Sequence, residues 1–181
     1  MSRTPPAPPV ELLREIVRIP SVSGDEHACR DHLAAWLRRA GLDARVSGRN
    51  VWAALEGQRP APAGRGLLLL THIDVVPVGP GWTREPWDGA LEGGRIHGRG
   101  SNDAKSSVAA MAWAAASLSR ERLAGRLVLA LVCDEETGGQ GIEALGGELP
   151  AYSASVVGEP TELEVCPGQR GLLRARLEAQ G

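Results

Sequence analysis

An uninterrupted run of seven apolar residues, Leu127-Val-Leu-Ala-Leu-Val-Cys133, constrains the fold more than any other feature of this chain. The run is far too short to cross a bilayer, which takes about 20 apolar residues. It is typical of a strand buried within a sheet that carries helices on its faces. The rest of the chain must therefore supply further strands and the helices that cover them.

The remaining sequence contains both kinds of segment. Apolar residues at helical spacing predict helices over 10–18, 23–40, 105–118 and 141–145, the second with a capping-box pattern at Ser23 and Glu26. Strand-like runs cover 44–46, 51–55, 67–73, 95–97, 126–133, 153–158 and 174–177. This alternation predicts an α/β fold, a layered α/β/α sandwich with a mostly parallel central sheet. Ligands of such folds gather at the carboxyl ends of the strands.

Composition narrows the classes of function. The 181 residues fit one domain, and a net charge of -2 with a pI near 6.1 gives no electrostatic case for nucleic acid or an acidic membrane surface. Residues 1–9 form a proline-rich leader without the apolar core of a signal peptide. Three cysteines without CxxC spacing argue against a disulfide framework or a structural zinc knot. We expect a reduced, cytoplasmic location and no membrane partner.

Side chains that bind metals stand at the ends of several predicted strands. They are His72, Asp74, Asp103, Glu135, Glu136 and Glu159. Neighbouring carboxylates such as Glu135 and Glu136 repel each other unless a positive charge lies between them. Each acid alone could be surface decoration, but their repeated position at strand ends predicts a site for divalent metal ions.

His72 and Asp74 are two residues apart in a strand, so their side chains point to the same face. His72 could bind a metal through one ring nitrogen while Asp74 polarises the ring. The alternative is an ordinary histidine with its hydrogen bonds satisfied at a strand end. His27 and His32, on the second predicted helix, are expected to be surface residues.

Asp103 precedes the Ala-rich segment 105–118, where an aspartate could also serve as a helix N-cap. The only lysine of the chain, Lys105, follows in Gly98-Arg-Gly-Ser-Asn-Asp-Ala-Lys105. This hints at a role that the larger fork of arginine would not serve. A phosphate-binding loop is a poor interpretation of these glycines, because the segment lacks the GxxxxGK[ST] pattern.

Glu135 and Glu136 point to opposite sides if the chain is extended there. One could bind a metal while the other takes a proton from metal-bound water and passes it to a leaving amine. The alternative is a solvated acidic turn.

The motifs Thr71-His-Ile-Asp-Val-Val-Pro77, Gly98 to Lys105, Asp134-Glu-Glu-Thr-Gly138 and Gly158-Glu-Pro-Thr161 together resemble the M20 metallopeptidase family. That family includes acetylornithine deacetylase, succinyl-diaminopimelate desuccinylase and glutamate carboxypeptidase. The resemblance implies a zinc-exopeptidase-like fold and zinc-dependent hydrolysis of an amide bond. The substrate it implies is an N-acyl amino acid, as in acetylornithine deacetylase, or a small peptide.

The resemblance also implies a role for each candidate residue. The family holds two zinc ions, with cobalt as a possible substitute. By this likeness Asp103 bridges the two zinc ions. His72 and Glu159 complete the ligands of one ion, and Glu136 binds the other. Glu135 is then the general base, and Asp74 orients His72. A cis peptide is expected between Asp103 and Ala104.

The sequence departs from the family pattern at its C-terminal end. By the resemblance, residues 10–169 form the N-terminal portion of a catalytic domain and residues 170–181 begin a lid and dimerisation domain. The last zinc-binding histidine and the homodimer contacts of the family would lie beyond Gly181. We therefore expect full ligands for only one zinc. A truncated fragment that is inactive or only binds metal is the alternative function.

Overall fold

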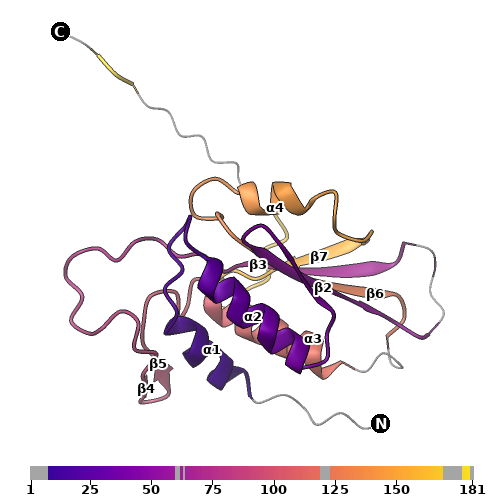
Figure 1. Cartoon of the computed structure of the whole chain (residues 1–181), viewed down its shortest axis with the longest axis horizontal. Helices are drawn as coiled ribbons and strands as arrows, with labels where there is room; N and C mark the ends of the chain where they lie inside the picture. Colours follow the sequence, from indigo (N-terminus) through magenta and orange to yellow (C-terminus); the bar gives the residue numbers. More distant parts are fainter. Residues whose placement is uncertain (1–7, 60–61, 63, 119–122, 169–176, 180–181) are drawn as a thin grey trace.

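Five strands form one central sheet (Figure 1). The computed structural model describes residues 8–59, 62, 64–118, 123–168 and 177–179. In sheet order the strands are β1 (Ala44–Ser47), β2 (Asn50–Glu56), β6 (Arg126–Val132), β3 (Gly66–His72) and β7 (Ala154–Val157). Strand β6, which carries the long apolar run, lies in the middle, and its residues from Leu127 to Val132 are all buried.

The sheet is mixed. Strand β3 pairs in parallel with β6 and β7, whereas β2 is antiparallel to both β1 and β6. Strand β2 therefore runs against the other four. The reason is local: β1 and β2 are joined by only Gly48 and Arg49, and so short a loop can connect only antiparallel neighbours. The predicted α/β sandwich is confirmed, with this hairpin added at one side.

Helices cover both faces of the sheet. Helices α1 (Pro9–Val17), α2 (His27–Arg39) and α3 (Lys105–Ser117) lie on one face, and the short α4 (Gln140–Leu145) lies on the other (Figure 1). The residues of β6 divide between these layers with the period of two that a strand imposes. Leu127, Leu129 and Leu131 pack in the core under the three helices, while Val128, Ala130 and Val132 pack with Leu145 of α4.

Neither of the two N-caps considered from the sequence is formed, although α3 begins at the expected Lys105. Ser23 does not cap α2, because its hydroxyl donates to Asp74 Oδ2 at 2.7 Å, and the N-cap residue is Glu26 without a side-chain cap. Asp103 is not the N-cap of α3, which is Ala104. In the first case a partner distant in sequence displaced the local hydrogen bond that the pattern predicts.

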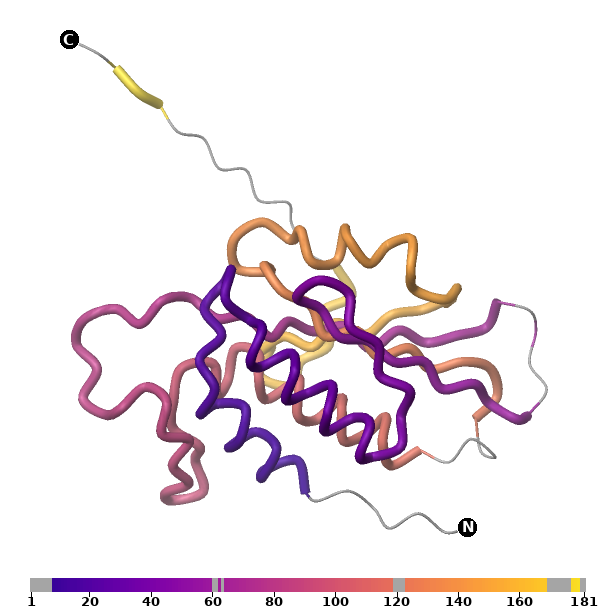
Figure 2. Tube along the Cα trace, in the orientation of Figure 1, coloured from indigo at the N-terminus to yellow at the C-terminus, as the bar shows by residue number. Residues whose placement is uncertain are grey.

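The long connection after β3 carries a small hairpin, β4 (Leu91–Glu92) with β5 (Arg95–Ile96), beside the main sheet. Figure 2 shows this connection as a loop that extends beyond the sheet before the chain enters α3. The leader, the predicted strand over 174–177 and the segment 170–181 lie largely outside the described residues. Within the described part, no helix has the length and apolar character needed to span a membrane.

The parallel strands bring distant segments to one edge of the sheet. His72, the last residue of β3, pairs with Val132 at the end of β6. Leu70 of β3 pairs with Val157 at the end of β7. The segments that follow β3, β6 and β7 therefore leave the sheet side by side, and each carries predicted site residues.

Candidate metal centre

Three of the predicted metal ligands converge at this edge. His72 Nε2 lies 3.2 Å from Asp103 Oδ1 and 3.8 Å from Glu159 Oε2. One ligand atom from each of the three residues lies within 4.8 Å of the others. The three come from the end of β3, the loop before α3 and the loop after β7, so the fold assembles the group from positions 31 and 87 residues beyond His72. A nitrogen with two carboxylates at this spacing is a donor set that suits zinc or cobalt.

The other ring nitrogen of His72 faces Asp74. Nδ1 lies 3.0 Å from the Asp74 carbonyl oxygen and 3.3 Å from its Oδ1. A carbonyl oxygen can only accept, so Nδ1 carries a hydrogen in this arrangement and Nε2 is directed at the carboxylates. This is the tautomer in which an imidazole binds a metal through Nε2.

When no metal is present, the neighbouring carboxylates favour the protonated form of His72. Burial alone would lower the pKa of His72, but hydrogen bonds and charges of Asp74 and Glu159 outweigh it and raise the pKa to about 11. The site therefore attracts positive charge at this point, as a proton or as a metal ion.

Asp74 is fully buried and makes several contacts at once. Its carboxylate accepts hydrogen bonds from Ser23 Oγ at 2.7 Å, from the Glu135 amide at 3.1 Å and from the Glu136 amide at 3.2 Å. Burial raises the pKa of Asp74, yet these bonds and His72 lower it overall. One carboxylate thus holds both the histidine and the acidic turn.

Glu135 and Glu136 lie in the turn after β6, outside the three-residue group. Burial and neighbouring carboxylates, including Asp103 in both cases, raise the pKa of each residue, while His72 lowers it. The structure therefore brings all six predicted site residues to one edge of the sheet. Glu136 has no histidine or cysteine grouped with it among the described residues.

Asp103 stands on an unusual backbone. The Asp103–Ala104 peptide is cis, which confirms the expectation from the resemblance. Its side chain is 54% exposed and so remains accessible to a ligand. The buried Lys105 next to it donates from Nζ to the Ile16 and Ile19 carbonyl oxygens at 2.9 and 2.8 Å. A slender ammonium group can reach both acceptors at the end of α1, and this explains why a lysine stands here.

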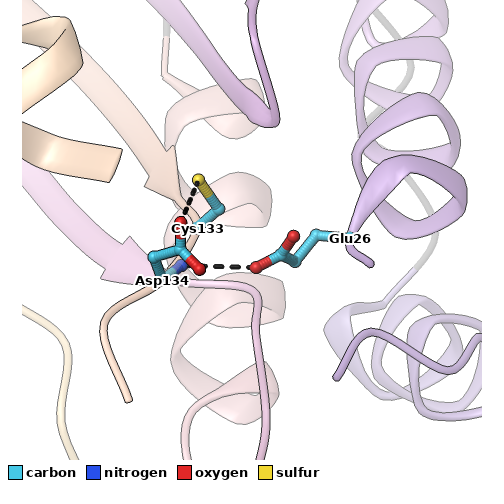
Figure 3. A group of neighbouring side chains, drawn as sticks. All are labelled: Glu26, Cys133 and Asp134. Atoms are coloured by element: carbon cyan, nitrogen blue, oxygen red, sulfur yellow. Dashed lines mark hydrogen bonds between the residues drawn. The ribbon is translucent and has the colours of Figure 1, made fainter. Parts of the chain in front are cut away.

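A second cluster was not predicted from the sequence. Glu26, Cys133 and Asp134 are all buried and lie within ligand distance of one another (Figure 3). Arg49, however, donates to both carboxylates and supplies the balancing positive charge. Burial raises the pKa of the Cys133 thiol to about 11. The Arg49 guanidinium already supplies the positive charge that a metal ion would bring to the two carboxylates. This cluster does not fit a metal ion.

His27 and His32 behave as surface residues. Both lie on α2, where His27 contacts Arg30 and His32 contacts Glu15 of α1 at 3.0 Å. Neither joins a metal-ligand group in the described part of the chain.

Comparison with known proteins decides the family. Residues 68–171, more than half of the chain, match the model of the group described as Peptidase family M20/M25/M40. This chain belongs to that family. The matched M20 segment contains every one of the six predicted site residues, and the resemblance seen in the sequence is confirmed.

Individual M20 proteins agree. A succinyl-diaminopimelate desuccinylase from Variovorax paradoxus is 32% identical over 205 residues, covering 100% of this chain and 50% of its own. An M20 family metallo-carboxypeptidase from Sulfolobus solfataricus superposes with a TM-score of 0.72 at 25% identity, covering 83% of this chain and 37% of its own. A Bacillus subtilis protein described as a dinuclear metal binding peptidase of the M20 family gives a TM-score of 0.63 at 18% identity, over 82% of this chain and 41% of its own. The chain thus spans about half the length of the curated relatives it matches.

Proposed function

We propose that this chain forms the N-terminal part of the catalytic domain of a zinc-dependent hydrolase. The enzyme cleaves an amide bond in an N-acyl amino acid or a small peptide. The observation that carries the proposal is the convergence of His72, Asp103 and Glu159 beside a turn that presents Glu135. The Asp74 carboxylate lies 3.3 Å from His72 Nδ1 and accepts from the amides of Glu135 and Glu136, so one buried side chain contacts both a metal ligand and the turn that carries the proposed base.

The donor set supports one zinc ion, with cobalt as a substitute, and the family resemblance implies a second ion beside it. His72, Asp103 and Glu159 would hold the first, Asp103 would bridge, and Glu136 would bind the second. Bound zinc lowers the pKa of a coordinated water and polarises the substrate carbonyl. The Bacillus subtilis relative is a dinuclear metal binding peptidase, which supports a pair of ions.

The chain's own residues prepare the reaction. Asp74 keeps the hydrogen on His72 Nδ1, so that Nε2 remains available as a ligand. The Glu135 carboxylate takes a proton from the attacking water and gives it to the nitrogen of the departing amine. Its raised pKa suits a group that must accept a proton and then release it.

The names of the relatives support the substrate class. One relative is called a desuccinylase of succinyl-diaminopimelate, an N-acyl amino acid, and another a metallo-carboxypeptidase. We propose an N-acyl amino acid of the acetylornithine type first and a peptide second. A cytoplasmic location belongs to the same proposal, and the three cysteines, none of them in a disulfide, agree with it.

The exposed strand β7 supports the assignment of residues 10–169 to part of a larger domain. All four of its residues are exposed, with Val156 at 48% and Val157 at 56%. A strand at the edge of a sheet is normally covered or protected. We propose that further strands cover it in the whole protein and that residues 170–181 begin the lid and dimerisation domain. The observation that Glu136 lacks a histidine partner among the described residues favours the second candidate function, a segment that binds metal without turnover.

Turnover measurements separate these functions. Zinc-loaded chain is assayed for release of amine from N-acetylornithine, N-succinyl-diaminopimelate and a dipeptide. We expect hydrolysis that chelation abolishes and that Glu135→Ala lowers by about a hundredfold or more. Glu148→Ala, an exposed acid that contacts Ser47, is the matched control. Zinc binding without turnover would support the second candidate, and turnover retained by Glu135→Ala would contradict the role of Glu135.

A further inference from the structure

The acidic turn is held by the second cluster as well as by Asp74. Asp134, the residue just before Glu135, has a φ of 58°, in the left-handed region that residues with a side chain rarely adopt. The chain bends there, and the next two amides donate to Asp74 Oδ1 and Oδ2. The position of Glu135 and Glu136 therefore depends on what keeps Asp134 in this conformation.

Arg49 grips Asp134 with a two-pronged contact. Its Nη1 donates to Asp134 Oδ1 at 3.1 Å, and its Nη2 donates to Oδ2. The Asp134 amide donates to Glu26 Oε1 at 3.3 Å, and its carbonyl oxygen accepts from Gly138 and Gly139. The side chain and the backbone of Asp134 are thus both held by hydrogen bonds. Because the guanidinium is planar, it fixes the orientation of the Asp134 carboxylate as well as its position.

Arg49 also makes the cluster tolerable in the interior. Glu26 is 0% exposed, and Arg49 Nη1 donates to its Oε2. Without the guanidinium, two buried carboxylates would face each other unpaired. Figure 3 shows Glu26 reaching from the start of α2 toward Asp134, which lies just after β6. Arg49 therefore ties the β1–β2 hairpin, helix α2 and the acidic turn together.

The next residue of the hairpin supports the same turn from another side. Asn50 Oδ1 accepts from the Cys133 amide at 2.9 Å, and Asn50 Nδ2 donates to the Gly141 carbonyl oxygen at 3.0 Å. Asn50 is buried, so both bonds are shielded from water. The residues on either side of the turn are thus pinned to β2.

We propose that Arg49, acting through Asp134 and Glu26, is a positioning residue for the turn that carries Glu135 and Glu136. Arg49 does not touch the metal group itself. Its fork sets the conformation of Asp134, which presents the next two amides to Asp74, and Asp74 in turn contacts His72. The inference rests on the proposed function only for the roles given to Glu135 and Glu136.

Hydrogen exchange on the metal-free chain tests this with Arg49→Lys. Lysine keeps the charge between Glu26 and Asp134 but cannot make the two-pronged contact. We expect the amides of Glu135 and Glu136 to exchange about tenfold faster or more, while those of Leu129 and Leu131 in β6 keep their protection. Arg45→Lys, on an exposed arginine of β1 that contacts Asp43, is the control and should change neither pair of amides.

Two results would overturn the inference. One is unchanged exchange at Glu135 and Glu136 in folded Arg49→Lys, which would show that charge alone suffices. The other is equal acceleration at the turn and in β6, which would show a general loss of stability. If Arg49→Lys does not fold, Asp134→Asn, which keeps one acceptor oxygen, is held to the same criteria. The measurement needs neither zinc nor substrate, so a chain without turnover would refute the proposed function and leave this result standing.

Discussion

Asp74→Asn is the substitution that tests the site most fully. Asp74 accepts hydrogen bonds from Ser23 and from the amides of Glu135 and Glu136, and its Oδ1 lies 3.3 Å from His72 Nδ1. Asparagine has the same shape but only one acceptor oxygen. In one orientation its NH₂ group would face the Glu135 N–H, and in the other it would face both the Glu136 N–H and the Ser23 hydroxyl. The charge beside His72 would also be lost.

The size of the effect follows from these contacts. Hydrogen bonds to a charged group contribute about 1.5–3 kcal/mol each, and breaking a buried pair costs about 3–5 kcal/mol. We expect the metal-free variant to lose about 3 kcal/mol of unfolding free energy. For a chain of this length that lowers Tm by about 6–12 °C. Loss of the carboxylate behind a metal-binding histidine should also weaken zinc binding about 10- to 100-fold.

Thermal unfolding followed by circular dichroism in the presence of a chelator measures the first effect. Competition with a zinc indicator dye measures the second. Asp31→Asn is the matched control. The Asp31 carboxylate is exposed and pairs with Arg30 at the surface, so its loss should cost less than about 1 kcal/mol. A folded Asp74→Asn with the wild-type Tm and zinc affinity would refute the role given to Asp74.

The same pair sets the pH dependence of the metal-free chain. The pKa of Asp74 is lowered by folding, so its contribution to stability is present above its unfolded pKa and is lost as pH falls through the folded value. The pKa of His72 is raised to about 11, so its contribution is complete below its unfolded pKa, near 6.5, and is lost as pH rises toward 11. Asp74→Asn should make the free energy of unfolding less dependent on pH, both at low pH and at high pH.

Three further outcomes are expected. Zinc must displace the proton of His72, so zinc binding between pH 7 and 8 should release about one proton. Calorimetry in buffers of different ionisation enthalpy measures this release as a buffer-dependent heat, and His72→Ala should not release the proton. Iodoacetamide should modify the exposed Cys166 first and reach the buried Cys133, whose pKa is raised to about 11, only after unfolding; equal rates in mass spectrometry would contradict the fold. Gly141→Ala should lower the denaturation midpoint, because the added Cβ would lie 2.2 Å from the Cys133 carbonyl oxygen, whereas Gly147→Ala meets nothing within 4 Å; equal midpoints would contradict this packing.

Local patterns predicted most of the fold. The apolar run of β6, the runs of β2 and β3 and the Ala-rich helix α3 all appear within one or two residues of their expected bounds. The side chains at the ends of β3, β6 and β7 meet because parallel strands end at the same edge, which the alternation of elements already implied.

The errors have a common physical cause. Ser23 failed as a cap because Asp74, 51 residues away, takes its hydroxyl. The contact of Glu26, Arg49 and Asp134 joins residues 23 and 85 positions apart, and no local pattern carries that information. Arg49 lies in the two-residue loop between β1 and β2. Only the topology shows which acids it meets.

Anomalous diffraction at the zinc edge, from crystals of the chain grown with zinc, tests the central claim most directly. The account predicts a strong peak bound by His72 Nε2 and the carboxylates of Asp103 and Glu159, and its loss in His72→Ala. A peak at Glu26, Cys133 and Asp134, or no peak beside His72 at saturating zinc, would contradict it.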